Sequence, residues 1–189
     1  MVSNNSLAIR RCSMKLRGKR VVVLVEDGFE DLEFWVPVMR LQEEGAEVTV
    51  AGKEKNRLYK GKGGLTAISD ADFKSIDVSE VDGILVPGGW APDKLRRFED
   101  VKDLIRTANE QKKIIAMICH AGLVGISAGI VEGSKSVGSD GIKDDLLNAG
   151  AIWLDEPAFS DGNLVWGRVV KDIPDFCREL VKAMEGKIR

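Results

Sequence analysis

Histidine is almost absent from this chain, which has one, His120, among 189 residues. Zinc-protease sites and two-histidine metal sites need at least two imidazoles, so a single chain cannot build them. The three cysteines, Cys12, Cys119 and Cys177, are odd in number, lie far apart and form no CxxC pair. This spacing argues against a zinc ribbon and against the disulfide framework of a secreted protein. We therefore expect no metal, no other cofactor, and a cytoplasmic location.

A secretory signal is also missing, because no apolar segment precedes a small-residue cleavage site near the N-terminus. Residues 1–20 instead carry six basic side chains and no acidic one. We expect residues 1–18 to be a flexible basic leader and residues 19–189 to be a single domain. The apolar run 114–131 is interrupted by His120, Ser127 and three glycines, so it predicts a buried strand followed by a helix rather than a membrane span.

Positive and negative charges are nearly balanced in this chain. There are 28 Lys and Arg residues against 30 Asp and Glu residues, and 44% of all residues are hydrophobic. This balance excludes a disordered chain and a globally basic nucleic-acid binder. We expect neither a nucleic acid nor a membrane as a partner.

Apolar runs alternate with amphipathic segments along the chain. Strands are predicted at residues 21–25, 48–51, 83–86, 114–118, 151–154 and 163–168, and helices near 30–44, 93–98, 101–111, from 120, near 142–149 and from 174. A small hairpin is expected within residues 53–68. Strands separated by helices predict an α/β fold with a mostly parallel sheet covered on both faces.

The first helix carries many apolar side chains. We expect its inward face to be formed by Leu32, Trp35, Val36, Met39 and Leu41, because helical periodicity groups apolar residues on one side. Gly45 is predicted to end the helix.

Chemistry is expected at the carboxyl ends of the parallel strands, where such sheets bind ligands. Cys119 follows the strand 114–118 and begins a helix, where backbone N–H groups favour a thiolate. A lone cysteine is more often a buried apolar residue, but the chain's one histidine, His120, is its neighbour. We therefore predict that Cys119 is a nucleophile, assisted by the ring or the backbone N–H of His120.

Two other strand ends supply candidate partners. Gly88 and Gly89 allow close backbone approach and can offer an N–H to an oxyanion, with Trp90 beside them as a substrate contact. Glu30, at the start of the first helix, is predicted to reach the sulfur as a protonated carboxyl; the alternative is an acid that only interacts with the helix dipole.

Several ordered motifs resemble the PfpI family, which lies in the superfamily of the parkinsonism-associated deglycase. The resemblance covers residues 19 to 185 and rests on segments 29–33, 85–93, 118–120, 142–151 and 161–165. It implies a flavodoxin-like three-layer sandwich in which Cys119 occupies a strained nucleophile elbow and Glu30 hydrogen-bonds its sulfur. It also implies a homodimer or homohexamer in which Asp93 of a neighbouring subunit orients His120, completing a triad across the interface.

The chain departs from that pattern in two places. Ala121 and Gly122 follow His120 where the family often has Gly-Pro, and Ser139 and Asp140 stand where an aromatic residue and a proline are common. The elbow is kept, but these changes predict a more open and more polar pocket.

Three functions remain open from the sequence. The first is a cysteine-dependent hydrolase with deglycase or glyoxalase chemistry on methylglyoxal or its adducts, as the resemblance implies. The second is an intracellular cysteine peptidase acting on damaged proteins or peptides. The third is a non-enzymatic stress protein, a redox sensor or a holdase, whose cysteine is oxidised.

Overall fold

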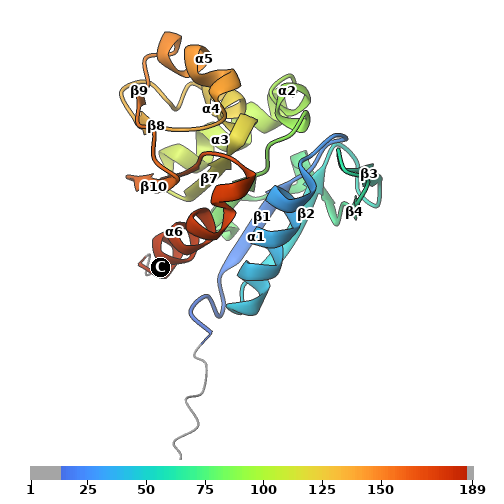
Figure 1. Cartoon of the computed structure of the whole chain (residues 1–189). Helices are drawn as coiled ribbons and strands as arrows, with labels where there is room; N and C mark the ends of the chain where they lie inside the picture. Colours follow the sequence, from blue (N-terminus) through green and yellow to red (C-terminus); the bar gives the residue numbers. More distant parts are fainter. Residues whose placement is uncertain (1–13, 187–189) are drawn as a thin grey trace, which may run out of the picture.

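The computed structural model describes residues 14–186, and a seven-stranded sheet lies at its centre (Figure 1). The strands of this sheet are β1 (Arg20–Leu24), β2 (Glu47–Gly52), β5 (Ala71–Asp72), β6 (Gly83–Val86), β7 (Ile114–Ile118), β10 (Ala158–Asp161) and β11 (Leu164–Gly167). Their order is β10-β11-β7-β6-β1-β2-β5, and all neighbours are parallel except β10 and β11. The predicted mostly parallel α/β sheet is confirmed.

The middle of the sheet is buried on both faces. All residues of β6, β7 and β11 are buried, as are residues 21–24 of β1. Strands covered on both faces need near-continuous apolar sequences, and this requirement explains the runs from which the strands were predicted.

Helices cover both faces of the sheet (Figure 1). They are α1 (Asp31–Glu43), α2 (Ala91–Leu95), α3 (Glu99–Glu110), α4 (Gly122–Ala128), α5 (Lys143–Asn148) and α6 (Ile173–Glu185). Helices α1 and α6 contact each other on one side, whereas α3 contacts α4, and α4 contacts α2, on the other side. These two helical layers and the sheet form the predicted three-layer sandwich.

Two short strand pairs lie outside the main sheet. The expected hairpin within residues 53–68 is present as β3 (Leu58–Lys60) and β4 (Thr66–Ile68), which pair antiparallel. The strand predicted at 151–154 is β9 (Ile152–Trp153), which pairs with β8 (Lys135–Ser136) and not with the main sheet. The hairpin projects beside the carboxyl end of β1, which places its tip close to the candidate site (Figure 1).

The folded part of the chain begins before residue 19. Leu16 is fully buried, and its N–H donates to the carbonyl of Glu44 at 2.8 Å. Leu16, which belongs to the predicted leader, therefore packs against the end of α1. The rest of the predicted leader, residues 1–13, lies outside the described residues.

The prediction for the inward face of α1 is wrong for three of its five residues. Leu32, Val36 and Met39 are exposed, and Met39 keeps 60% of its surface. The buried face consists instead of Asp31, Glu33, Phe34, Pro37, Val38 and Leu41. Two apolar stripes run along this helix, and the sheet covers the stripe that includes Phe34 and Leu41. The other stripe, Leu32, Val36 and Met39, is not covered by any of residues 14–186.

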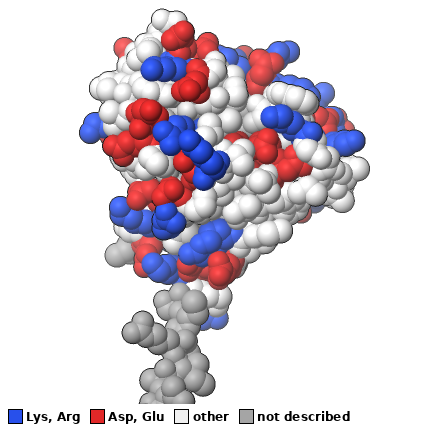
Figure 2. Space-filling model, viewed as in Figure 1, with Lys and Arg blue, Asp and Glu red and all other residues white. Residues whose placement is uncertain are grey.

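Acidic and basic side chains are interspersed on the face shown in Figure 2. Over residues 14–186, no helix has both the length and the apolar character that crossing a membrane requires.

Candidate active site

The loops that follow β1 and β6 are joined by backbone hydrogen bonds. Trp90 N–H donates to the Gly28 carbonyl at 2.7 Å, and Glu30 N–H donates to the Gly88 carbonyl at 3.1 Å. The Cys119 turn follows β7, which is the neighbour of β6 in the sheet. Side chains from all three loops line a cavity of about 690 Å³, which lies within the size range of small-molecule sites.

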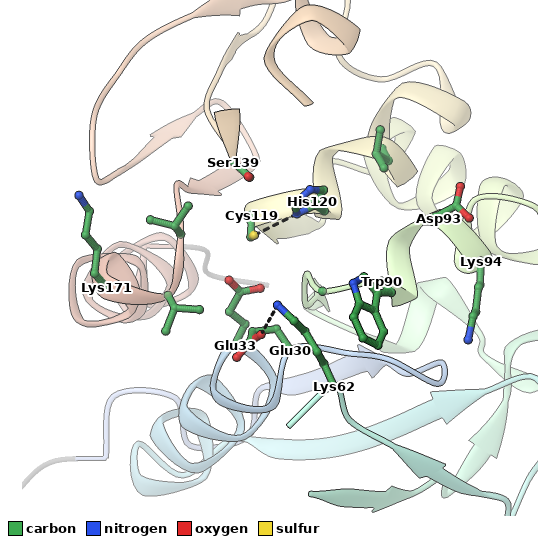
Figure 3. A pocket seen from close by; sticks show the side chains of 14 residues that line it. Glu30, Glu33, Lys62, Trp90, Asp93, Lys94, Cys119, His120, Ser139 and Lys171 are labelled. Carbon is green, nitrogen blue, oxygen red and sulfur yellow. Dashed lines mark hydrogen bonds and ion pairs between the residues drawn. The ribbon is translucent and has the colours of Figure 1, made fainter. Parts of the chain in front are cut away.

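Cys119 has a backbone conformation that L-residues rarely adopt. Its φ is +61°, in the left-handed region, directly after the extended strand β7. This sharp turn leads through the 3₁₀ segment Cys119–Ala121 into α4. Strain of this kind persists where the surrounding structure enforces it, and it is typical of functional positions. The half-buried thiol faces the cavity, and its Sγ lies 3.2 Å from Nδ1 of His120 (Figure 3).

The carboxyl that contacts Cys119 is that of Glu33 and not that of Glu30. Glu33 is fully buried, its carboxyl and the Cys119 thiol each shift the pKa of the other, and Gly88 N–H donates to Glu33 Oε2 at 2.9 Å. Glu30 lines the same cavity, but its Oε2 pairs with Lys62 Nζ at 3.7 Å. Glu30 precedes the first helical residue, whereas Glu33 lies on the buried face one turn further on. The prediction that Glu30 hydrogen-bonds the sulfur is therefore corrected to Glu33.

The protonation of Glu33 and that of Cys119 depend on each other. Burial and the nearby Glu30 charge raise the pKa of Glu33 to about 7, although the hydrogen bond with Cys119 opposes this shift. Burial, the negative charge of Glu33 and the hydrogen bond to it raise the pKa of the Cys119 thiol to about 12. Two adjacent buried anions are strongly disfavoured, so the pair retains at least one proton near neutral pH. When that proton lies on Glu33, the carboxyl acts as a donor and the sulfur can carry the charge.

Two backbone N–H groups also face the sulfur. Those of His120 and Gly89 hydrogen-bond Cys119 and lower the pKa of its thiol, because they stabilise the thiolate. The ring of His120 is half-buried, and burial and the charge of Lys62 lower its pKa. The imidazole is therefore neutral near pH 7 and available to accept a proton.

The two glycines at the end of β6 have different uses. A Cβ on Gly88 would lie 2.3 Å from Glu33 Oε2 and 2.7 Å from the Cys119 Cβ, so only glycine fits between them. Its N–H donates to Glu33 and is not free for an oxyanion, which corrects the prediction for this residue. Gly89 has φ +80°, and a Cβ there would lie 2.5 Å from Glu30 N. In this conformation the Gly89 N–H faces the sulfur. Gly89 is one of the two glycines that were predicted to donate an N–H to an oxyanion.

Trp90 and Asp93 both line the outer part of the cavity (Figure 3). Trp90 is 62% exposed, and Asp93 is also exposed and forms an ion pair with Arg97 one helical turn later. Within residues 14–186, no hydrogen bond or ion pair joins Asp93 to His120. The structure of one chain thus brings Cys119 and His120 together but leaves the predicted triad incomplete.

Among residues 14–186, no group of three or more His, Cys, Asp and Glu side chains could hold a metal ion. Glu33 and Lys62 are among the cavity residues that the sequence did not predict. Glu33 had a signal, since it lies one helical turn after Glu30 and next to the buried Phe34. No sequence feature indicated Lys62, because its position depends on how the β3–β4 hairpin packs against the start of α1.

Residues 19–183 match the DJ-1/PfpI family. A protein from Pyrococcus abyssi named as a deglycase is 39% identical over 166 residues, which cover 88% of this chain and 99% of that protein. A protein from Bacillus subtilis named "Putative cysteine protease YraA" is 33% identical over 167 residues, covering 88% of this chain and 99% of that protein.

Among solved structures, a two-domain protein from Anabaena variabilis with DJ-1/ThiJ/PfpI-like and ferritin-like domains superposes with a TM-score of 0.85 at 38% identity. The match covers 87% of this chain and 47% of that chain, so this chain spans about half the length of that protein. The flavodoxin-like architecture, the elbow at Cys119 and the family match over most of the sequence agree. The chain described here belongs to the DJ-1/PfpI family.

Proposed function

We propose that this protein is a cysteine-dependent hydrolase with deglycase or glyoxalase chemistry, acting on methylglyoxal or on its adducts with amines and thiols. The observation that carries the proposal is the environment of Cys119. Its sulfur faces a protonatable buried carboxyl, two backbone N–H groups and a neutral imidazole, all at one end of a cavity of small-molecule size. The name of the Pyrococcus abyssi relative supports the same reading.

The proposed reaction needs no outside oxidant or reductant. The Cys119 thiolate adds to the aldehyde carbon, forming a C–S bond, and the aldehyde oxygen takes a proton to give a hemithioacetal. His120 then removes the hydrogen of that carbon as a proton, and a proton is returned to the neighbouring carbon, so the first carbon is oxidised and the second is reduced. The product is a thioester of a hydroxy acid, which water cleaves to release the acid and the thiol. In an adduct, the amine or thiol leaves as the C–S bond forms.

Each group near the sulfur has a role in this sequence. Glu33 shares its proton with the sulfur and so allows a thiolate in a buried place, while the N–H groups of Gly89 and His120 stabilise negative charge on sulfur and on the substrate oxygen. His120 Nδ1 is 3.2 Å from Sγ, close enough to move a proton at the attacked carbon. Trp90 forms the outer wall against the substrate.

The proposed assembly is a homodimer or homohexamer that places Asp93 of one subunit beside His120 of another. Asp93 is exposed at the rim of the cavity, and the imidazole lacks an orienting carboxylate within the described part of its own chain. The exposed apolar stripe of α1, Leu32, Val36 and Met39, provides a surface that association can bury.

A cysteine peptidase is the second candidate, and the name of the Bacillus subtilis relative favours it. The same nucleophile and the same N–H donors would serve an acyl-enzyme reaction on a peptide carbonyl. The two candidates differ in the bond that is broken and in the product that is released.

Product analysis separates the candidates. Wild type and Cys119→Ser, at matched oligomeric state, are incubated with methylglyoxal-treated N-acetylarginine and, in parallel, with an unstructured peptide. We expect wild type to release a hydroxy acid and free N-acetylarginine and to leave the peptide intact, with no release by Cys119→Ser. Peptide cleavage without hydroxy acid release would replace the deglycase proposal by the peptidase. Equal behaviour of the two proteins on both substrates would contradict a cysteine-dependent hydrolase altogether.

A further inference from the structure

Lys62 reaches the active site from outside the three loops that carry the nucleophile. It lies between β3 and β4, at the tip of the hairpin, and its side chain lines the cavity. Figure 3 shows its nitrogen directed into the space below Cys119 and His120, next to Glu30 and Glu33. Its charge lowers the pKa of both Glu33 and His120, so the ammonium group acts on the groups beside the sulfur.

The backbone around Lys62 is fixed to the first loop and to the start of α1. Lys62 N–H donates to the Phe29 carbonyl at 2.8 Å. The buried carboxylate of Asp31 accepts the N–H groups of Gly63 and Leu65 at 2.5 and 2.6 Å. These three hydrogen bonds hold the tip against the start of the helix that also carries Glu33. A lysine that served only solubility would need no such support.

The ammonium group itself keeps donors free. Within residues 14–186 its ion pair is with Glu30 Oε2 at 3.7 Å, which is longer than a hydrogen bond, and its nitrogen lies 5.8 Å from the Trp90 ring centroid. Its side chain is 46% exposed toward the cavity mouth. The neighbouring Lys94 differs, because its Nζ donates to the Asp27 carbonyl at 2.8 Å and is already engaged.

We propose that Lys62 binds the carboxylate of small 2-hydroxy and 2-oxo acids in this site, and so recognises the acid that the reaction releases. The inference rests on the proposed function, in which the carbon bonded to Sγ leaves as a carboxylate. In the proposed reaction the carboxylate arises at the carbon bonded to Sγ, beside His120. The Lys62 nitrogen is directed toward this part of the cavity (Figure 3). A carboxylate there gains a charge–charge attraction with the ammonium group, in addition to a hydrogen bond, whereas the uncharged aldehyde substrate can gain only the hydrogen bond.

Two consequences follow for the enzyme. The released hydroxy acid competes with substrate for the free site, so it is a product inhibitor. Aldehydes that carry a carboxylate, such as glyoxylate, bind more tightly than neutral aldehydes of the same size.

The test compares lactate with lactamide, which have the same shape but differ in charge. Binding of each to the wild-type protein is measured by calorimetry or ligand-observed NMR, and then repeated with Lys62→Met. We expect lactate to bind wild type about tenfold more tightly than lactamide does, because its negative charge is attracted to the ammonium group, and Lys62→Met to remove this preference. Lys62→Arg should retain most of it.

Lys60→Met is the matched control, because Lys60 lies on the same hairpin, is exposed and does not line the cavity. It should bind both compounds as wild type does. The proposal is overturned if lactate fails to bind wild type, if lactamide binds equally well, or if Lys62→Met keeps the preference. If Lys62→Met does not fold, Lys62→Gln takes its place, and a preference for lactate that Lys62→Gln keeps would overturn the proposal.

This binding assay is independent of turnover, so its failure is distinguishable from failure of the proposed function. A protein that converts methylglyoxal through Cys119 but shows no preference for lactate over lactamide has the proposed function without the Lys62 site. A protein that binds lactate through Lys62 but releases no hydroxy acid has the acid-binding site without the proposed reaction.

Discussion

Replacing Glu33 by Gln tests whether the carboxyl beside Cys119 is held in its protonated form by the fold. The amide has nearly the same shape, can still accept the N–H of Gly88 and can still donate to the sulfur, but it cannot ionise. In the wild type, burial raises the pKa of Glu33 from 4.5 to about 7. The folded protein therefore binds more protons than the unfolded chain between these two values.

The sign of the effect follows from proton linkage. Where the folded state binds more protons, stability decreases as the pH rises, so the contribution of Glu33 is fully present below pH 4.5 and is lost by the time the pH has passed 7. Between pH 5 and pH 8 a single group with this shift removes about 2.5 kcal/mol from the free energy of unfolding. Glu33→Gln has no such group and should not show that loss.

Urea denaturation at pH 5 and pH 8 measures the difference. We expect Glu33→Gln to gain about 2 to 3 kcal/mol relative to wild type on going from pH 5 to pH 8, while losing activity because its amide cannot share a proton with the sulfur. Cys119→Ser with Glu33 intact should keep a slope of the same sign, which separates the carboxyl from the thiol. Parallel pH dependences for wild type and Glu33→Gln would refute the raised pKa.

Three other changes test separate parts of the structure. Gly88→Ala should destabilise the fold by about 1–3 kcal/mol and abolish activity, because the new Cβ overlaps Glu33 Oε2; wild-type melting behaviour would contradict the tight contact. Cys119→Gly should be about 1 kcal/mol more stable than Cys119→Ala, since only glycine adopts a φ of +61° without strain; thermal unfolding compares the two, and equal stability would argue against strain. Met39→Lys, on the exposed face of α1, should lower the oligomeric state seen by light scattering, and an unchanged mass would exclude this stripe from the interface.

The position of Cys119 was predictable because its signal is local. A continuous apolar run, residues 114–118, predicts a buried strand, and the residue that follows such a strand lies at the ligand-binding edge of a parallel sheet. Cys119 and His120 are found there, with the turn that the resemblance implied. The left-handed conformation of Cys119 has no signature of its own, since cysteine carries no preference for it.

The acid partner of Cys119 was not predictable at the level of a single residue. Glu30 and Glu33 are one helical turn apart, and the choice between them depends on where α1 begins and on which of its two apolar stripes meets the sheet. The stripe with Leu32 and Met39 has as many apolar residues as the stripe with Phe34 and Leu41. Packing against the sheet decides between them, and packing is a property of the whole fold.

The roles of Lys62 and Asp93 depend on contacts that are distant in sequence. Lys62 reaches the cavity because the buried carboxylate of Asp31 holds the hairpin tip, a contact that spans more than thirty residues. Asp93 lies at the rim of the cavity, and its proposed role belongs to a second subunit. Neither relationship leaves a periodic pattern in the sequence.

The most direct test of the account is the conversion of methylglyoxal to lactate, followed by ¹H NMR, by wild type and by Cys119→Ser. Light scattering and circular dichroism establish that the two proteins have the same mass and fold. We expect wild type to form lactate catalytically, with many turnovers per subunit, and Cys119→Ser to form none above the rate without protein. Lactate formation at equal rates by both proteins, or by neither, would contradict the assignment of Cys119 as the nucleophile of a glyoxal-converting hydrolase.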